Sequence, residues 1–259
     1  MGQTIMLTGM VLSAVPVGEY DKRITLLTKE RGKIAAFARG ARKPGSQIMA
    51  ASNPFSFGKF EAYEGRNSYT VVKADIINYF RTLAMDFEGA YYGFYFMEIA
   101  NYYARENTEE LHMLKLLYQS LRALENNHIE HRLVRRIFEL KAMVINGEYP
   151  NVFVCLHCGT EENLNWINIK CGGTLCESCA KKLPSFYLDK STLYTMQYII
   201  TTSIEKVYTF AVSPKVLANL EKIMNEYMNT YIDKTFQSLT VLEENQGFAL
   251  GLNLGKRES

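Results

Sequence analysis

Short runs in which apolar and polar residues alternate dominate the first eighty positions of the chain. Five such runs, separated by turn-forming residues, lie at 5–12, 23–28, 32–39, 55–63 and 69–75. The connection Lys29-Glu30-Arg31-Gly32 is short and contains glycine, which predicts a β-hairpin between the second and third runs. Five short strands in so few residues favour a small closed barrel of the OB-fold type.

From about Thr82 the apolar positions recur with the helical period of 3.6 residues. Apolar stripes predict three helices, at approximately 83–98, 111–124 and 133–144. The third helix should end near Gly147, because Pro150 follows shortly after it. This change of period predicts that a helical domain follows the barrel.

Two more helices are predicted towards the end of the chain. Ser191 or Thr192 could cap the first of them, which reaches about residue 200. Ser213 followed by Pro214 is a typical N-cap and first-turn pair, and it begins a longer helix with an apolar stripe as far as Tyr231. Most of the chain after the barrel is therefore expected to be helical.

Two C-x-x-C pairs interrupt the helical region. They consist of Cys155 with Cys158 and Cys176 with Cys179, and seventeen residues separate the pairs. This spacing is typical of a tetrahedral zinc site with four thiolate ligands. Such a site leaves no open position for water or substrate, so we expect one structural zinc ion. Redox-active or free thiol pairs are the alternative.

Two neighbouring residues bear on the zinc prediction. His157 lies between the first two cysteines and could replace one of them as a ligand, although the C-x-x-C geometry already supplies both sulfurs. Cys171 is the fifth cysteine and is left over, either as an alternative ligand or nucleophile or as a plain thiol, which we favour.

The predicted fold is α+β and multidomain. Its expected parts are an OB-fold at 1–80, a helical domain at 81–150 and 183–247, an inserted zinc module at 151–182 and a flexible tail at 248–259.

Positive charge is concentrated in the predicted barrel, although the whole chain carries a net charge of only +2. Residues 22–43 hold eight basic residues against the single acid Glu30, a local charge of +7. The basic residues are Lys22, Arg23, Lys29, Arg31, Lys33, Arg39, Arg42 and Lys43. So lopsided a stretch favours a nucleic-acid backbone as partner over a merely solvated face, and residues 39–45 are expected to form a mobile basic loop.

Aromatic residues are interleaved with this charge and could stack on bases. They are Phe37, Phe55, Phe57, Phe60, Tyr63 and Tyr69, and their alternation favours core packing for most of them.

A second basic group, Arg132, Arg135 and Arg136, lies on the third predicted helix with Lys141. These arginines could contact phosphates or pair with Glu130 and Glu139, and the sequence leaves both possibilities open. Helices rich in Tyr and Phe, around Phe94 and Tyr102, could also line a surface for a peptide.

The sequence carries no recognisable active site. It has no phosphate-cradling loop, no nucleophile elbow and no cluster of acids in the basic segment to hold catalytic Mg²⁺, so we expect a protein that is not an enzyme and disfavour a nuclease. No secretory signal and no apolar run of membrane-spanning length are present, which favours a cytoplasmic location with no membrane partner.

Several motifs together resemble the bacterial RecO family of recombination mediators. They are A-R-G-A-R-K at 38–43, R-I-F-E-L-K at 136–141, N-G-E-Y-P-N at 146–151, and C-x-x-C-G followed by G-G-T-L-C-x-x-C. The resemblance covers nearly the whole chain. It implies a non-enzymatic DNA-repair factor, associated with the nucleoid, with an OB-fold, a helical domain and a zinc module.

The resemblance also implies partners. Members of this family bind single- and double-stranded DNA, anneal complementary strands, partner RecR, and help load RecA onto DNA coated by single-strand-binding protein. In some members the helical domain binds that protein's acidic, hydrophobic C-terminal tail. The basic residues at 22–43 become DNA-binding candidates and the four paired cysteines zinc ligands, while Cys171 departs from the family pattern. A zinc-stabilised protein-interaction adaptor with incidental DNA binding is the alternative.

Overall fold

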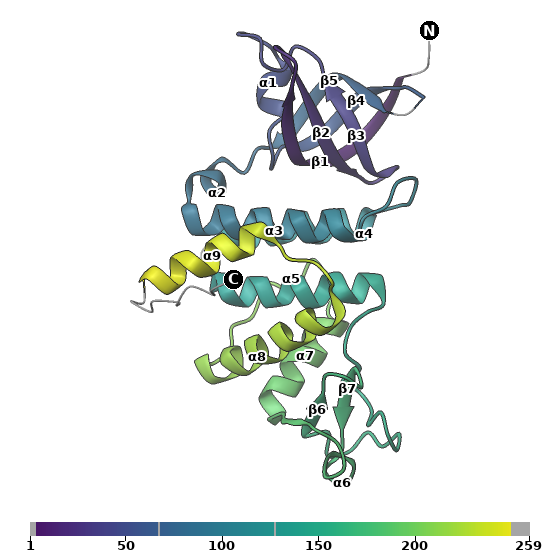
Figure 1. Cartoon of the computed structure of the whole chain (residues 1–259), viewed down its shortest axis with the longest axis vertical. Helices are drawn as coiled ribbons and strands as arrows, with labels where there is room; N and C mark the ends of the chain where they lie inside the picture. The colour runs from purple at the N-terminus through teal and green to yellow at the C-terminus, as the bar shows by residue number, and fades with distance from the viewer. Residues whose placement is uncertain (1–3, 67, 127, 250–259) are drawn as a thin grey trace, which may run out of the picture. The chain divides into compact units, whose positions relative to one another are not determined.

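The computed structural model describes residues 4–66, 68–126 and 128–249 (Figure 1). The chain folds into two compact units. One unit runs as far as Glu125 and resumes at Phe236, and the other spans Asn126–Thr235. The second unit is thus inserted, in sequence, before the last helix of the first.

A closed five-stranded barrel forms the beginning of the first unit, as predicted. Its strands are β1 (Thr4–Val17), β2 (Asp21–Thr28), β3 (Gly32–Ala38), β4 (Phe57–Glu64) and β5 (Tyr69–Asn78). They follow the order β1-β2-β3-β5-β4, and the long β1 pairs with both β2 and β4 to close the barrel. Only β3 and β5 pair in parallel among the barrel strands. Inward-facing side chains such as Leu26 and Phe60 fill the interior.

The predicted hairpin between β2 and β3 is present, and Gly32 explains its shape. Gly32 has a φ of +64°, and a Cβ atom there would lie 2.0 Å from the carbonyl oxygen of Arg105. Only glycine therefore permits this turn and this close approach of two backbones. The amide of Lys33 donates to the same Arg105 oxygen (3.0 Å), which ties the hairpin to the segment between α3 (Phe87–Tyr103) and α4 (Leu111–Glu125).

Helices α2 (Arg81–Met85), α3, α4 and α9 (Gln237–Ala249) complete this unit, with the short α1 (Ile48–Ala51). The prediction of one helix over 83–98 was wrong, because Asp86 interrupts the helix and separates α2 from α3. Asp86 has extended backbone angles, and its carboxylate accepts a hydrogen bond from the amide of Gly89 (2.8 Å), so it caps α3. Helix α3 is apolar around most of its circumference because β1, α4 and α9 all contact it.

The second unit contains α5 (His131–Asn146), α7 (Lys190–Thr201) and α8 (Pro214–Tyr231), and α5 contacts both of the others. Gly147 ends α5 with a φ of +74°, and Ser213 caps α8 through the amide of Val216, both as predicted. The second unit also holds α6 (Glu177–Ala180) and a small sheet that was not predicted. Its strands are β6 (Trp166–Asn168), β7 (Gly173–Leu175) and β8 (Phe186–Tyr187).

The predicted cap of α7 was wrong by two or three residues. Neither Ser191 nor Thr192 caps the helix; Asp189 does, and its carboxylate accepts hydrogen bonds from both of their amides (3.0 and 3.1 Å). The hydroxyl of Thr192 and the side-chain amide of Asn219 on α8 also donate to it (2.6 and 2.8 Å). Burial alone would raise the pKa of Asp189, but these donors outweigh it and lower the pKa below its usual value.

We expect Asp189→Ala to destabilise the protein by about 1–2 kcal/mol at pH 7, the usual value for a lost N-cap. Since the folded-state pKa is lowered, this stabilisation is present above the unfolded pKa of about 3.9 and is lost as the pH falls through the folded pKa. Urea unfolding at pH 7 and below pH 4 measures the change. Asp189→Asn is the matched control, because it keeps a neutral cap and should remove mainly the pH dependence.

The sequence predicted no membrane-spanning segment and a flexible tail at 248–259. Within the residues that the structure describes, no helix is both long enough and apolar enough to cross a membrane. Of the predicted flexible tail at 248–259, residues 250–259 lie outside the described residues, and 248 and 249 belong to α9.

Candidate metal centre and nucleic-acid interface

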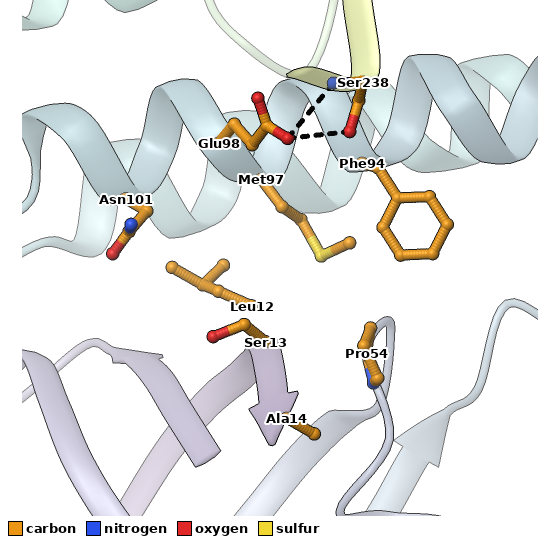
Figure 2. Close-up of a pocket in the computed structure, with 9 residues that line it drawn as sticks. All are labelled: Leu12, Ser13, Ala14, Pro54, Phe94, Met97, Glu98, Asn101 and Ser238. Atoms are coloured by element: carbon orange, nitrogen blue, oxygen red, sulfur yellow. Dashed lines mark hydrogen bonds between the residues drawn. The ribbon is translucent and has the colours of Figure 1, made fainter. Parts of the chain in front are cut away.

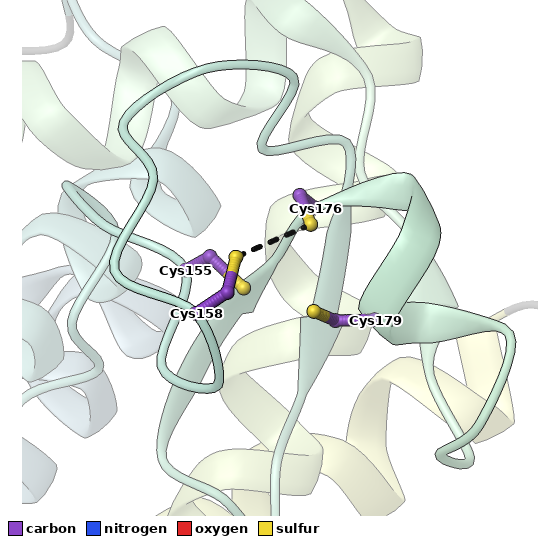
Figure 3. Close-up of side chains that lie close together, drawn as sticks. All are labelled: Cys155, Cys158, Cys176 and Cys179. Atoms are coloured by element: carbon purple, nitrogen blue, oxygen red, sulfur yellow. Dashed lines mark hydrogen bonds between the residues drawn. The ribbon is translucent and has the colours of Figure 1, made fainter.

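The four paired cysteines converge in the second unit (Figure 3). Their sulfur atoms all lie within 4.8 Å of one another, and the Sγ atoms of Cys158 and Cys176 are 3.7 Å apart. A tetrahedral zinc ion with Zn–S bonds of about 2.3 Å requires sulfur–sulfur distances of about 3.8 Å. A disulfide requires about 2.05 Å. The four sulfurs therefore fit a metal ion, and all five cysteines are free thiols.

Local backbone structure places each pair of sulfurs. In the first pair, the amide of Gly159 donates to the carbonyl of Cys155 (2.8 Å), and Gly159 has a φ of +77° that favours glycine. In the second pair, β7 leads directly to Cys176, which caps the short α6, and the amide of Cys179 donates to the Cys176 carbonyl (3.1 Å). Each pair of sulfurs is thus placed by a tight turn.

The thiols of the cluster differ in their acidity. Burial tends to raise the pKa of Cys155, but backbone amides of Cys176, Cys158 and His157 outweigh this and lower it to about 6. The neighbouring Cys176 thiol and burial raise the pKa of Cys179 to about 12. The Cys155 and Cys179 thiols therefore differ in the pH at which each ionises. A divalent metal would provide the charge that all four thiolates need.

Neither alternative ligand belongs to the cluster among the described residues. The Nδ1 atom of His157 lies 3.5 Å from the sulfur of Cys179, so the ring is beside the site. Cys171 is exposed, and its amide donates to the side chain of Asn168 (2.8 Å). The arrangement therefore leaves four sulfurs as the candidate ligands.

The basic run at 22–43 is divided into two groups by the β2–β3 hairpin. Because β2 and β3 are antiparallel, Lys22 pairs with Ala38 at one end of the strands and Thr28 pairs with Gly32 at the other. Lys22 and Thr28 are six residue steps apart on β2, so these ends are separated by about 20 Å. We call the first group the basic end, and it consists of Lys22, Arg23, Arg39, Arg42 and Lys43.

Residues of the basic end are held on a defined framework. Ala41 is fully buried and anchors the loop, and the amide of Arg42 donates to the carbonyl of Tyr20 (2.8 Å). The loop that was expected to be mobile is therefore tied to the β1–β2 turn. The ammonium of Lys43 lies 5.2 Å from the centre of the Tyr20 ring, and that of Lys22 donates to the Asn53 side chain (2.7 Å).

Electrostatics at the basic end reflects the crowding of like charges. Burial, and then the nearby guanidinium of Arg42, lower the pKa of Lys22. Arg39, Arg42 and Lys43 are exposed to solvent. The acids Glu19 and Asp21 stand against the five cations, and Asp21 accepts a hydrogen bond from the amide of Gly40 (2.7 Å). The group therefore has an excess of positive charge.

The second group, Lys29, Arg31 and Lys33, is more closely engaged with the protein itself. Arg31 lies 3.8 Å from the carboxylate of Glu64, and the ammonium of Lys33 donates to the carbonyl of Asn101 at the end of α3 (2.7 Å). Lys29 is exposed. These contacts give Arg31 and Lys33 structural partners that the sequence did not reveal.

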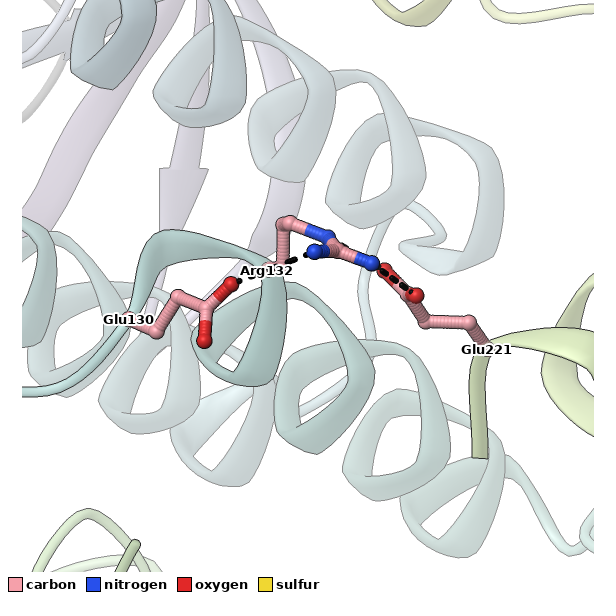
Figure 4. A network of polar contacts seen from close by, with 3 residues as sticks. All are labelled: Glu130, Arg132 and Glu221. Atoms are coloured by element: carbon pink, nitrogen blue, oxygen red, sulfur yellow. Dashed lines mark hydrogen bonds and ion pairs between the residues drawn. The ribbon is translucent and has the colours of Figure 1, made fainter. Parts of the chain in front are cut away.

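The three arginines of α5 make ion pairs, as in the alternative interpretation of the sequence. The guanidinium of Arg132 lies between Glu130 and Glu221 (Figure 4), and its Nε is 2.8 Å from Glu221. Arg135 and Arg136 are buried, and both bind the fully buried carboxylate of Glu139 at 2.8 Å. These two cannot reach a phosphate without leaving the core, so we do not retain them as DNA contacts.

The structure shows which aromatic residues of the barrel are buried and which lie on its outer face. Phe55, Phe60 and Tyr69 are buried, and the ring of Phe57 packs on Tyr118 of α4 at 4.6 Å between centroids. Phe37 is half-buried and Tyr63 is 37% exposed, both on the outer face of their strands. The outward position of Phe37 could have been found in the sequence from the alternation along β3. Ala36 and Ala38 face inward, so Phe37 between them must face outward.

A small cavity of about 260 Å³ lies between β1, α3 and α9 of the first unit (Figure 2). Leu12, Phe94 and Met97 give it an apolar lining. The carboxylate of Glu98 accepts hydrogen bonds from the amide (3.2 Å) and the hydroxyl (2.8 Å) of Ser238 on α9. The segment leading into α9 partly covers the tyrosine-rich surface of α3, since Phe236 packs on the ring of Tyr95 at 5.4 Å.

Comparisons with known proteins agree with this architecture. The family model described as "Recombination protein O N terminal" matches residues 1–80, and "Recombination protein O C terminal" matches residues 84–240. Among curated proteins, "DNA repair protein RecO" of Acetivibrio thermocellus is 29% identical over 91% of this chain and 95% of its own length. That of Alkaliphilus metalliredigens is 29% identical over 91% and 97%.

A third relative, from Halalkalibacterium halodurans, carries the same name and is 28% identical over 93% of this chain and 95% of its own length. The matches thus extend over both compact units, and the family models together cover the barrel, most of the helices and the four-cysteine segment. The chain therefore belongs to the RecO family of DNA repair proteins.

Proposed function

We propose that this protein is a non-enzymatic mediator of homologous recombination that binds single- and double-stranded DNA and anneals complementary strands. With RecR, it helps to load RecA onto single-stranded DNA coated by single-strand-binding protein. Its place of action is the nucleoid in the cytoplasm. DNA binds the OB-fold at 1–80, the helices of 81–150 and 183–247 carry protein contacts, and the module at 151–182 holds one zinc ion.

The observation that carries this proposal is the basic end of the barrel. Five cations gather there on a framework of hydrogen bonds, and Arg39 and Arg42 are exposed. A cluster of this kind neutralises phosphates and releases their counterions, which favours nucleic acid over a neutral partner. Family membership in a group named for DNA repair supports the same function.

Salt dependence tests the DNA-binding function directly. We expect log K for a single-stranded oligonucleotide to fall linearly with log[salt], by about 0.7 for each phosphate contacted. Five contacts would give a slope of about −3.5. Fluorescence anisotropy between low and physiological salt measures the slope. Affinity that does not change with salt would argue against the basic end as the binding site.

A zinc-stabilised adaptor that binds DNA only incidentally is the second candidate. The apolar cavity bordered by Phe94 and Met97 favours it, as a place for part of a peptide such as the tail of single-strand-binding protein. Glu98 at this cavity would oppose an acidic peptide, however. An adaptor should bind bare DNA only at micromolar or weaker Kd at physiological salt.

Incubation of labelled DNA with Mg²⁺ or Mn²⁺ tests the non-enzymatic assignment, and we expect no cleavage.

A further inference from the structure

Five residues on different strands form one continuous row on the outer face of the barrel. The register pairs Val15 with Arg23, Arg23 with Phe37, Phe37 with Thr70, and Thr70 with Tyr63. Residues paired across neighbouring strands project on the same face, so their side chains are neighbours. Around the barrel the row therefore presents an apolar residue, a cation, an aromatic ring, a small residue and a second aromatic ring.

We propose that Phe37 and Tyr63 form a stacking surface for the unpaired bases of single-stranded DNA. The proposal rests on the DNA-binding function proposed above and assigns the part of that site which distinguishes single strands from duplex. Both rings lie on the outer face, whereas Ile34 of β3 and Phe60 of β4 are buried in the core. Thr70 between them is small, and Tyr63 is 37% exposed.

Charge beside the rings fits this occupant. Arg23 lies directly across the strand pair from Phe37, and Arg39 follows Phe37 by two residues, immediately after the end of β3. Both arginines belong to the basic end and are exposed. A phosphate backbone held there would bring its bases over the ring of Phe37, which is the arrangement of a positively charged groove with aromatic platforms.

Spacing and base accessibility make the surface selective. Phe37 and Tyr63 are two strand spacings apart, about 10 Å along the barrel surface, so each ring can serve a different base. In duplex DNA the faces of the bases are covered by their neighbours in the stack. Only the splayed bases of a single strand can therefore use the rings, whereas both forms can use the arginines.

The test compares a thymidine oligonucleotide with a blunt duplex of equal length, by anisotropy at one salt concentration. We expect Phe37→Leu and Tyr63→Leu each to weaken single-strand binding about 5- to 150-fold, the range for loss of one stacked base. Duplex binding and the salt slope should stay unchanged, because no charge is altered. Tyr194→Leu is the matched control, since Tyr194 is 67% exposed and lies in the other compact unit.

A second variant keeps the proposal testable if Phe37→Leu disturbs the fold. Phe37→Trp retains an aromatic face and should bind single strands at least as well as the wild type. The chain has one tryptophan, Trp166, so quenching of the added indole by the oligonucleotide, above the wild-type signal, reports direct stacking. Absence of quenching together with unchanged affinity in the leucine variants would overturn the proposal.

The outcomes separate this inference from the function on which it rests. If single-strand and duplex binding fall equally in the leucine variants, the rings do not stack on bases and the inference fails. If the leucine variants bind normally but charge reversal at Arg39 and Arg42 abolishes binding, DNA uses the basic end without the rings. If neither set of changes affects binding, the DNA-binding function of this face is itself wrong.

Discussion

Replacement of Cys176 by serine is expected to remove the bound metal and unfold the four-cysteine segment. Cys176 is buried and contributes both a sulfur to the cluster and the start of α6. The core of this segment is small and is made largely of the cysteines themselves, with Leu164 and Leu175. Folding free energy from zinc in small modules reaches about 10–16 kcal/mol. This is as large as the whole stability of a typical domain, about 5–15 kcal/mol.

Elemental analysis should find one zinc ion per chain in the wild type and much less than one in the variant. Limited proteolysis should cut the variant between the two C-x-x-C pairs, while the barrel remains protected because it lies in the other compact unit. Cys171→Ser is the matched control, since Cys171 is exposed and outside the sulfur cluster. Metal-free protein with an intact, protected segment would show that the metal is dispensable.

Local chemistry explains which parts of the fold could be predicted from the sequence. The barrel strands follow a period of two, and the ends of α5 and α8 are set by Gly147 and by Ser213 with Pro214, whose preferences act within a few residues. The cysteine spacing likewise predicted the convergence of four sulfurs, because each turn geometry is encoded in a C-x-x-C pair. These signals need no information about distant segments.

Contacts between distant segments explain what the sequence could not show. The basic run looked like one stripe, but the hairpin reverses the chain, and only the strand register places Lys22 and Lys29 at opposite ends of β2. The pairing of Arg135 with Glu139 was visible as an i, i+4 spacing. Its burial was not, since it depends on the packing of α7 and α8 against α5. Similarly, nothing local marks Phe236 as the residue that packs on Tyr95.

The division of the basic run leads to the second large effect. Arg39→Glu combined with Arg42→Glu should weaken single-strand binding on the order of 100-fold at about 0.1 M salt. Loss of two phosphate contacts removes about 1.4 from the salt slope, which alone corresponds to about 25-fold at this concentration, and the new carboxylates add repulsion. Both side chains are exposed, and the turn is held by the buried Ala41 and by backbone hydrogen bonds, so the substitutions should leave the barrel folded.

The matched control reverses the same number of charges at the other end of β2, with Lys29→Glu and Arg31→Glu. It changes the net charge equally, so any effect of overall charge on DNA affinity is common to both variants. A binding site at the basic end predicts a much larger loss, and a smaller salt slope, for the Arg39 and Arg42 variant than for the control. Equal losses in the two variants would instead indicate that DNA responds to the total charge of the barrel, because the groups lie about 20 Å apart along β2.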